Sequence, residues 1–194
     1  MKRIIIIVLC VVIIMGILYV FYKDQYKQKN ENKTILWKKN TDENNFSAEM
    51  NKNNFFKLIM DVPDWKAKND EDILKPLINY LSNRPDEEIY AFHDIMNELL
   101  YNLDTRENFE IAKKYYNHSD DSFLYSRCVA LINGKEYYDK VSKHKVDDLW
   151  IKEFETILSV PMLAWQIKYK QDISNYPHVP LYCCETGSNK NGWK

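Results

Sequence analysis

The stretch that decides the fold is Asn117–Val141, NHSDDSFLYSRCVALINGKEYYDKV, which holds the strongest helix start and the strongest helix stop of the chain. Ser119 can cap a helix because its hydroxyl accepts from free backbone N–H groups, and Asp120 and Asp121 place negative charge at the positive helix end. Gly134 follows the last apolar residue, where a left-handed conformation costs glycine nothing. The stretch therefore predicts a helix that ends just before Gly134 and a second helix directly after it.

Apolar residues that recur every three or four positions predict further helices on both sides of this stretch. Asn51 can cap the first helix, Pro63 stops it, and Pro85 opens the helix with the clearest period. Other helices are expected from about residues 74, 105, 147 and 161. The predicted fold class is all-α, a compact bundle of about seven or eight helices preceded by one transmembrane helix.

Four segments of the sequence resemble one known family. Two lie in the central stretch, SDDSFLYSR and ALINGKEYY, and the others are MNKNNFFKLI at Met50–Ile59 and EEIYAFHDIMNELLY at Glu87–Tyr101. They are similar to the SDD-x-F-x-Y-x-R and LI-x-x-GK-x-x-Y signature of a bacterial family, domain of unknown function 4240. The resemblance runs from Met50 to about Gln171 and implies a small, mainly helical domain with no assigned activity. The chain departs from the pattern at Ser126, where an aromatic residue is usual.

The first residues of the chain predict a membrane anchor. Lys2 and Arg3 precede Ile4–Tyr22, a run without charge. At about 1.5 Å per residue, a helix of this length comes close to the roughly 30 Å of a bilayer's hydrocarbon core. No small-residue cleavage site follows the run, which favours an uncleaved anchor over a signal peptide. The lipid bilayer is therefore an expected partner, reached through Ile4–Tyr22.

The remaining chain divides by composition. Residues 23–49 are rich in Lys and Asn and form a polar linker, whose basic half could also lie on anionic lipid. Residues 50–171 form the helical domain. Residues 172–194 lose the helical period and contain Pro and Gly, so a loose or extended tail is expected. Its apolar residues offer a means of holding it against the domain, namely Tyr176, Leu181, Tyr182 and Trp193.

Charge and cysteine content bear on partners and location. The 27 basic and 28 acidic side chains give a net charge of −1, so no nucleic-acid partner is expected. Lysines on both sides of the anchor give conflicting signals for its orientation. An odd number of cysteines follows the anchor, and the adjacent pair Cys183 and Cys184 could bond to each other only under strain. We favour a domain on the cytoplasmic face, and the extracytoplasmic face stays open.

One polar cluster is the candidate site, and it has two interpretations. The adjacent carboxylates could hold a hard cation, with the histidine as a further ligand or general base. Alternatively they only cap the helix, and the arginine pairs with a carboxylate of a neighbouring helix. No further ligands stand at fixed spacing, so no bound metal and no cofactor are predicted. The residues of this cluster are His118, Ser119, Asp120, Asp121 and Arg127.

Two functions follow from these interpretations, and the sequence leans against an enzyme. The first is a non-catalytic protein-interaction module on a membrane anchor, and the second is a metal-assisted enzyme or small-ligand-binding domain. His93, Cys128 and the Cys183–Cys184 pair are expected to be structural. Under the first function the two aspartates face solvent, whereas under the second they converge with other ligands in a pocket. The expected interaction surface consists of Tyr115, Tyr116, Tyr125, Tyr137 and Tyr138.

Overall fold

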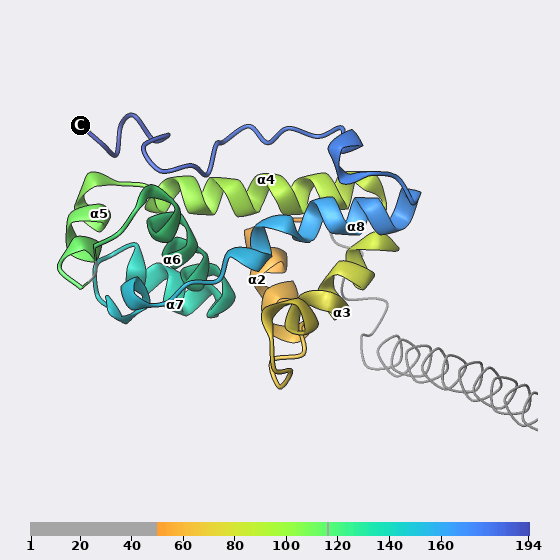
Figure 1. Ribbon diagram of the computed structural model, residues 1–194, viewed down its shortest axis with the longest axis horizontal. Coiled ribbons are helices and arrows are strands. Elements are labelled where there is room, and N and C mark those ends of the chain that lie inside the picture. Colours follow the sequence, from red (N-terminus) through yellow and green to blue (C-terminus); the bar gives the residue numbers. More distant parts are fainter. Residues whose placement is uncertain (1–49, 116) are drawn as a thin grey trace, which may run out of the picture. The chain divides into compact units, whose positions relative to one another are not determined.

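The computed structural model describes residues 50–115 and 117–194, and in this part of the chain it contains no strand (Figure 1). The all-α prediction is therefore confirmed for these residues. They form seven α-helices and three 3-10 turns: α2 (Lys52–Asp61), α3 (Asp70–Ser82), α4 (Asp86–Leu103), α5 (Arg106–Lys113), α6 (Asp120–Ile132), α7 (Gly134–Val141), η1 (Asp148–Ile151), η2 (Glu155–Ser159), α8 (Val160–Tyr169) and η3 (Ile173–Asn175).

The helix boundaries follow from local signals that the sequence shows. Asn51 caps α2, where its side-chain oxygen accepts from the N–H groups of Asn53 and Asn54. Ser119 caps α6, as predicted. Gly134 has a φ of +83°, a left-handed conformation that turns the chain from α6 directly into α7. The start and the stop of the central stretch are therefore both confirmed.

Replacing Gly134 by alanine is expected to destabilise the domain by about 1–2 kcal/mol, because an L side chain is strained at this φ. A Cβ atom here would also lie 2.8 Å from Sδ of Met60, which must then move. The midpoint of urea unfolding measures the effect. Alanine at the exposed neighbour Lys135 is the matched control, and equal midpoints for the two variants would contradict the argument.

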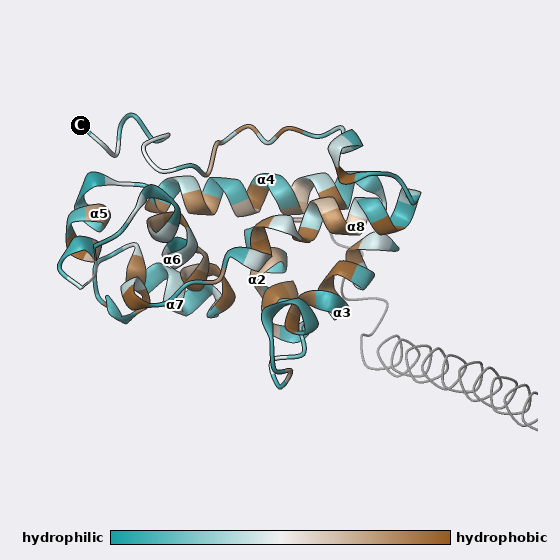
Figure 2. Cartoon of the chain, viewed as in Figure 1, coloured by the Kyte–Doolittle hydropathy of each residue, from teal (hydrophilic) through white to brown (hydrophobic). Residues whose placement is uncertain are grey.

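The core is built around α4 and α6. Two pairs of fully buried aromatic rings mark it: Phe55 of α2 lies against Phe92 of α4, with ring centroids 4.8 Å apart, and Phe123 of α6 stacks on Trp150 at 5.5 Å. Figure 2 shows hydrophobic residues on the faces where these helices meet. Burial of such side chains is the main stabilising contribution to the bundle.

One predicted helix is wrong. Instead of a continuous helix from Asp147, the chain forms the separate turns η1 and η2 with an extended break between them. The reason lies in α6, which supplies other partners at the break. Ser126 Oγ donates to the carbonyl of Lys152 over 2.8 Å, and the N–H of Phe154 donates to the carbonyl of Tyr125 over 3.2 Å. These bonds replace the ones that a helix would make.

Residues 172–194 run along the outside of α4 in the same direction as the helix (Figure 1). His178 lies 2.9 Å from Asp94, and the ring centroids of Tyr182 and Tyr101 lie 5.0 Å apart. Apart from η3 this segment has no helix. We call residues 176–185 the strap and residues 186–193 the clasp.

The predicted anchor, Ile4–Tyr22, and the linker of residues 23–49 lie outside the described residues. Within residues 50–115 and 117–194, no helix combines the length and the apolar character needed to cross a bilayer.

Candidate functional site

The predicted polar cluster is divided by the fold into an outer and an inner part. In the outer part, Ser119 Oγ accepts from the N–H of Ser122 over 3.1 Å, and Nδ1 of the buried His118 lies 3.1 Å from Ser122 Oγ. Asp120 and Asp121 occupy the first turn of α6, where both residues are exposed. Among the described residues no group of three or more His, Cys, Asp or Glu side chains is arranged to hold a metal ion. The helix start thus has the geometry of a cap.

Arg127 forms the inner part, because it points from α6 into the core. Its side chain is fully buried, and Nη1 donates to the carbonyl of Leu100 over 2.9 Å and lies 4.0 Å from Asp104 Oδ1. The guanidinium also covers the ring of Phe123, with Cζ 4.8 Å from the ring centroid. Burial lowers the pKa of Arg127, and the nearby Asp104 opposes that change. The buried cation therefore depends on Asp104, a fully buried carboxylate at the end of α4.

The clasp supplies the hydrogen bonds that satisfy Asp104. Its Oδ1 accepts from the N–H of Gly187 over 3.1 Å and from the indole N–H of Trp193 over 2.8 Å. Its Oδ2 accepts from the N–H of Asn189 over 2.9 Å, and Ser188 Oγ lies 3.3 Å from it while donating to the carbonyl of Cys183 over 2.6 Å. The buried carboxylate of Asp104 is thus engaged by donors from the same chain, which gives it a structural surrounding.

One further residue of the clasp joins the two parts of the predicted cluster. Thr186 Oγ1 accepts from Arg127 Nη2 over 3.1 Å and donates to the backbone carbonyl of Asp120 over 2.7 Å. The structure therefore links Arg127 to the start of α6 through Thr186, and the carboxylates of Asp120 and Asp121 take no part in that link. Arg127, Asp104 and the clasp together form a closed polar centre.

Close packing holds the clasp in place. A Cβ atom on Gly192 would lie 2.8 Å from the backbone oxygen of Asp104, so the clasp can approach α4 this closely only with glycine there. The ring of Trp193 lies 5.2 Å from that of Phe109, centroid to centroid, and Phe109 in turn contacts Phe123 at 5.1 Å. The polar centre is thus sealed by aromatic rings.

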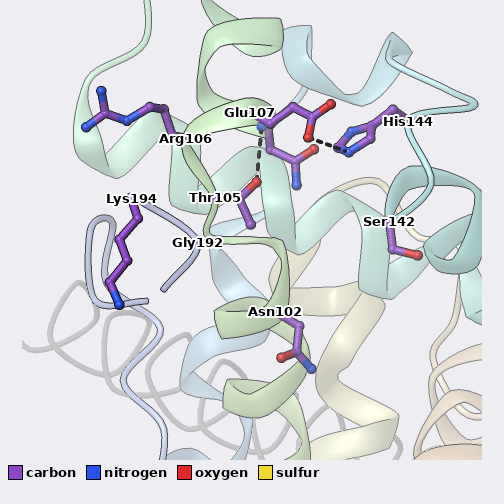
Figure 3. A pocket seen from close by; sticks show the side chains of 9 residues that line it. Asn102, Thr105, Arg106, Glu107, Ser142, His144, Gly192 and Lys194 are labelled. Carbon is purple, nitrogen blue, oxygen red and sulfur yellow. Dashed lines mark hydrogen bonds and ion pairs between the residues drawn. The ribbon is translucent and has the colours of Figure 1, made fainter. Parts of the chain in front are cut away.

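A polar hollow of about 480 Å³ lies outside this centre, at the corner between α4 and α5 (Figure 3). On its rim His144 Nε2 lies 3.3 Å from Glu107 Oε2. The side chains of Arg106 and Lys194 point away from this pair (Figure 3), and Arg106 Nε donates to the carbonyl of Trp193 over 3.2 Å. Since the charged groups do not converge on one point, the hollow lacks the geometry of a catalytic site.

The remaining candidates have structural surroundings. His93 packs against the strap, where its Nδ1 lies 3.2 Å from the hydroxyl of Tyr176. Cys128 is fully buried, and burial raises the pKa of its thiol. Cys183 and Cys184 carry free thiols, and burial raises the pKa of Cys184 to about 11. A raised pKa is the opposite of the lowered pKa that nucleophilic cysteines show, so Cys128 and Cys184 lack this mark of a nucleophile.

Sequence reasoning missed Asp104 and the polar residues of the clasp, although it named Trp193 as a residue that could hold the tail against the domain. Asp104 directly follows the last apolar residue of α4. An acidic residue at such a position normally indicates a helix end that is exposed to solvent. The clasp is a run of Gly, Ser and Asn, which reads as a loop. The one available signal was Arg127 itself, because an arginine on an otherwise apolar helix face needs a buried carboxylate nearby.

Replacing Ser119 by alanine is expected to cost about 1 kcal/mol of domain stability, because the N–H of Ser122 loses its acceptor. Thermal unfolding followed by circular dichroism measures the loss. Ser119→Asp is the matched control, since an aspartate can accept the same bond and should retain most of the stability. A loss as large in the Asp variant as in the Ala variant would contradict the capping role.

An all-α domain with a capped central helix and a closed polar centre is therefore the class that fold and site define. The family model described as protein of unknown function (DUF4240) matches residues 50–163, more than half of the chain. The chain belongs to this family, as the resemblance implied. No curated protein and no solved structure matches it.

Proposed function

We propose that the protein is a membrane-tethered protein-interaction module and that its partner contacts the outward face of the strap. The proposal is carried by one observation: the strap is fixed to α4 on one side and presents uncovered aliphatic side chains on the other. The tether is the anchor that the sequence predicts at Ile4–Tyr22, outside the described residues.

Burial alternates along the whole strap. Every even-numbered residue from Tyr176 to Cys184 is partly covered, and every odd-numbered residue from Pro177 to Glu185 is exposed. Side chains of an extended chain point alternately to opposite sides, so the odd-numbered ones form one outer row. Val179 is 85% exposed and Leu181 83% exposed, the two largest values among the exposed large hydrophobic residues of the described chain. The strap therefore offers apolar surface that the domain itself leaves uncovered.

The composition of the strap agrees with a contact surface. Residues 173–184 contain no Asp, Glu, Lys or Arg, although these residues make up 28% of the chain. Depletion of charged side chains is typical of the core of a protein interface. Figure 2 shows hydrophobic, brown stretches along the strap where it runs beside α4.

The tyrosines that the sequence suggested as an interaction surface do not form one exposed set in the described part of the chain. Tyr138 is buried, and its hydroxyl donates to the carbonyl of Leu99 over 2.9 Å. Tyr137 donates to Asp148 over 2.6 Å, a contact within the domain. The prediction is therefore wrong for Tyr138, and Tyr116 lies outside the described residues.

Site-specific photocrosslinking in intact cells tests the proposal. A photoreactive amino acid at Leu181 of the full chain is expected to give an adduct with one protein, identified by mass spectrometry. The exposed residue Lys143 is the matched control position and should give no such adduct.

A second substitution shows whether the outer row is the contact. Val179→Asp should reduce the Leu181 adduct at least about tenfold, because burying a charge without a partner in an apolar contact costs several kcal/mol. Absence of a protein adduct at Leu181, or an adduct unaffected by Val179→Asp, would overturn the proposed contact surface.

A further inference from the structure

Two histidines join the strap to α4. His93 of α4 and His178 of the strap lie with ring centroids 5.8 Å apart, edge to face. His178 Nε2 lies 2.9 Å from Asp94 Oδ1, and its ring stacks on Tyr90 at 4.7 Å with 14° between the planes. Together with Tyr176, which contacts His93, these residues form what we call the histidine latch: Tyr90, His93, Asp94, Tyr176 and His178.

The residues of the histidine latch cover His93. That residue is buried, whereas Asp94 and His178 are partly exposed at its edge. Burial is the main cause that lowers the pKa of His93, to about 4; His178 adds to the effect and Asp94 opposes it. The neutral ring fits this site, because the Tyr176 hydroxyl can donate to it or accept from it, whereas burial disfavours the charged ring.

The carboxylates near the histidine latch already have other partners. Asp94 is engaged by His178, and at the start of α4 Asp86 is paired with Lys168 of α8. Tyr176 is also covered by Trp165 of α8, with ring centroids 5.9 Å apart. No carboxylate in the described part of the chain lies within ion-pair distance of His93 to compensate a proton on it.

We propose that proton uptake by His93 releases the strap from α4, so that mild acid converts the attached strap into a free arm. A proton on the buried ring places an uncompensated charge beneath the strap and opposite His178. Detachment of the strap exposes His93 to water, where the charged ring is solvated. The inference concerns the attachment of the strap, and it holds whether or not the strap binds a partner.

The sign and the size of the effect follow from linkage. In the attached state His93 resists protonation, whereas in the released state it takes up a proton near its ordinary pKa of about 6.5. Acid therefore favours the released state, because that state binds more protons. Between pH 7.5 and pH 5 the ratio of released to attached strap should rise about 30-fold.

The test measures the attachment of the strap directly in the full chain. A trifluoromethyl tag on the exposed Cys183, with Cys10 and Cys184 replaced by serine, reports attached and released populations by fluorine NMR in detergent micelles. Circular dichroism at each pH establishes that the helices stay folded. The expected result is a rise of about 30-fold in the released fraction relative to the attached one.

Matched histidine variants isolate the responsible group. His93→Gln keeps a polar side chain for Tyr176 but cannot take up the proton, so the rise with acid should disappear. His144→Gln removes a histidine of the distant α7 turn and should leave the rise intact. A pH-independent ratio in the tagged chain, or an undiminished rise in His93→Gln, would overturn the inference.

Discussion

Replacing Asp104 by alanine is expected to destabilise the domain by about 3–5 kcal/mol, the cost of leaving a buried cation without its partner. The expectation rests on Arg127, which is fully buried 4.0 Å from Asp104. The same substitution removes the acceptor of three donors in the clasp, the N–H groups of Gly187 and Asn189 and the indole N–H of Trp193. Urea unfolding of the full chain, followed by tryptophan fluorescence, measures the change.

Two further variants separate this explanation from a general loss of packing. The double variant Asp104→Leu with Arg127→Met removes both charges. It should lose less stability than the sum of the losses in Asp104→Leu alone and Arg127→Met alone, by at least about 1 kcal/mol. Asp139→Ala removes an exposed carboxylate paired with Lys135 and should change stability by less than about 0.5 kcal/mol. Strict additivity in the double variant would refute the buried pair.

Ending the chain after Glu185 is expected to cost about 3 kcal/mol or more, because Asp104 then loses charge-assisted hydrogen bonds that contribute roughly 1.5–3 kcal/mol each. Partial hydration of the opened centre limits the loss. The ring contact between Trp193 and Phe109 is removed as well. Urea unfolding followed by circular dichroism at 222 nm measures the change without relying on Trp193.

Point variants within the clasp give a graded control. Gly192→Ala places a Cβ atom 2.8 Å from the Asp104 backbone oxygen and should cost about 1–3 kcal/mol through overpacking. Lys190→Ala changes an exposed side chain and should stay within about 0.5 kcal/mol. If the shortened chain unfolds at the same urea concentration as the full chain, the clasp has no stabilising role.

The helices could be predicted because their signals are local. Ser119, Gly134 and Pro85 act on their own backbone within one turn, and the apolar period of α4 needs no knowledge of the rest of the chain. The helix expected from Asp147 failed for the opposite reason. Backbone groups of Lys152 and Phe154 bond to Ser126 and Tyr125, which lie more than 25 residues earlier in the chain. A local sequence pattern carries no information on such distant partners.

The candidate site was predictable only in part, and for the same reason. Ser119 was correctly placed as a cap, and the presence of Arg127 on an apolar face indicated a buried partner. The partner itself could not be named from the sequence. Asp104 is covered by the clasp, and Gly187, the first clasp residue that donates to it, lies 83 residues further along the chain. A run of Gly, Ser and Asn shows no hydropathy pattern from which that contact could be inferred.

The separation of Asp104 from its clasp also sets an order of events during synthesis. A ribosome makes the chain from its first residue onward, so Asp104 and Arg127 are both present well before Gly187 has been added. In that interval Arg127 can still contact Leu100 and Phe123, but Asp104 lacks the hydrogen bonds that the clasp donates. We therefore expect the end of α4 to complete its packing last, once the closing residues of the chain have emerged.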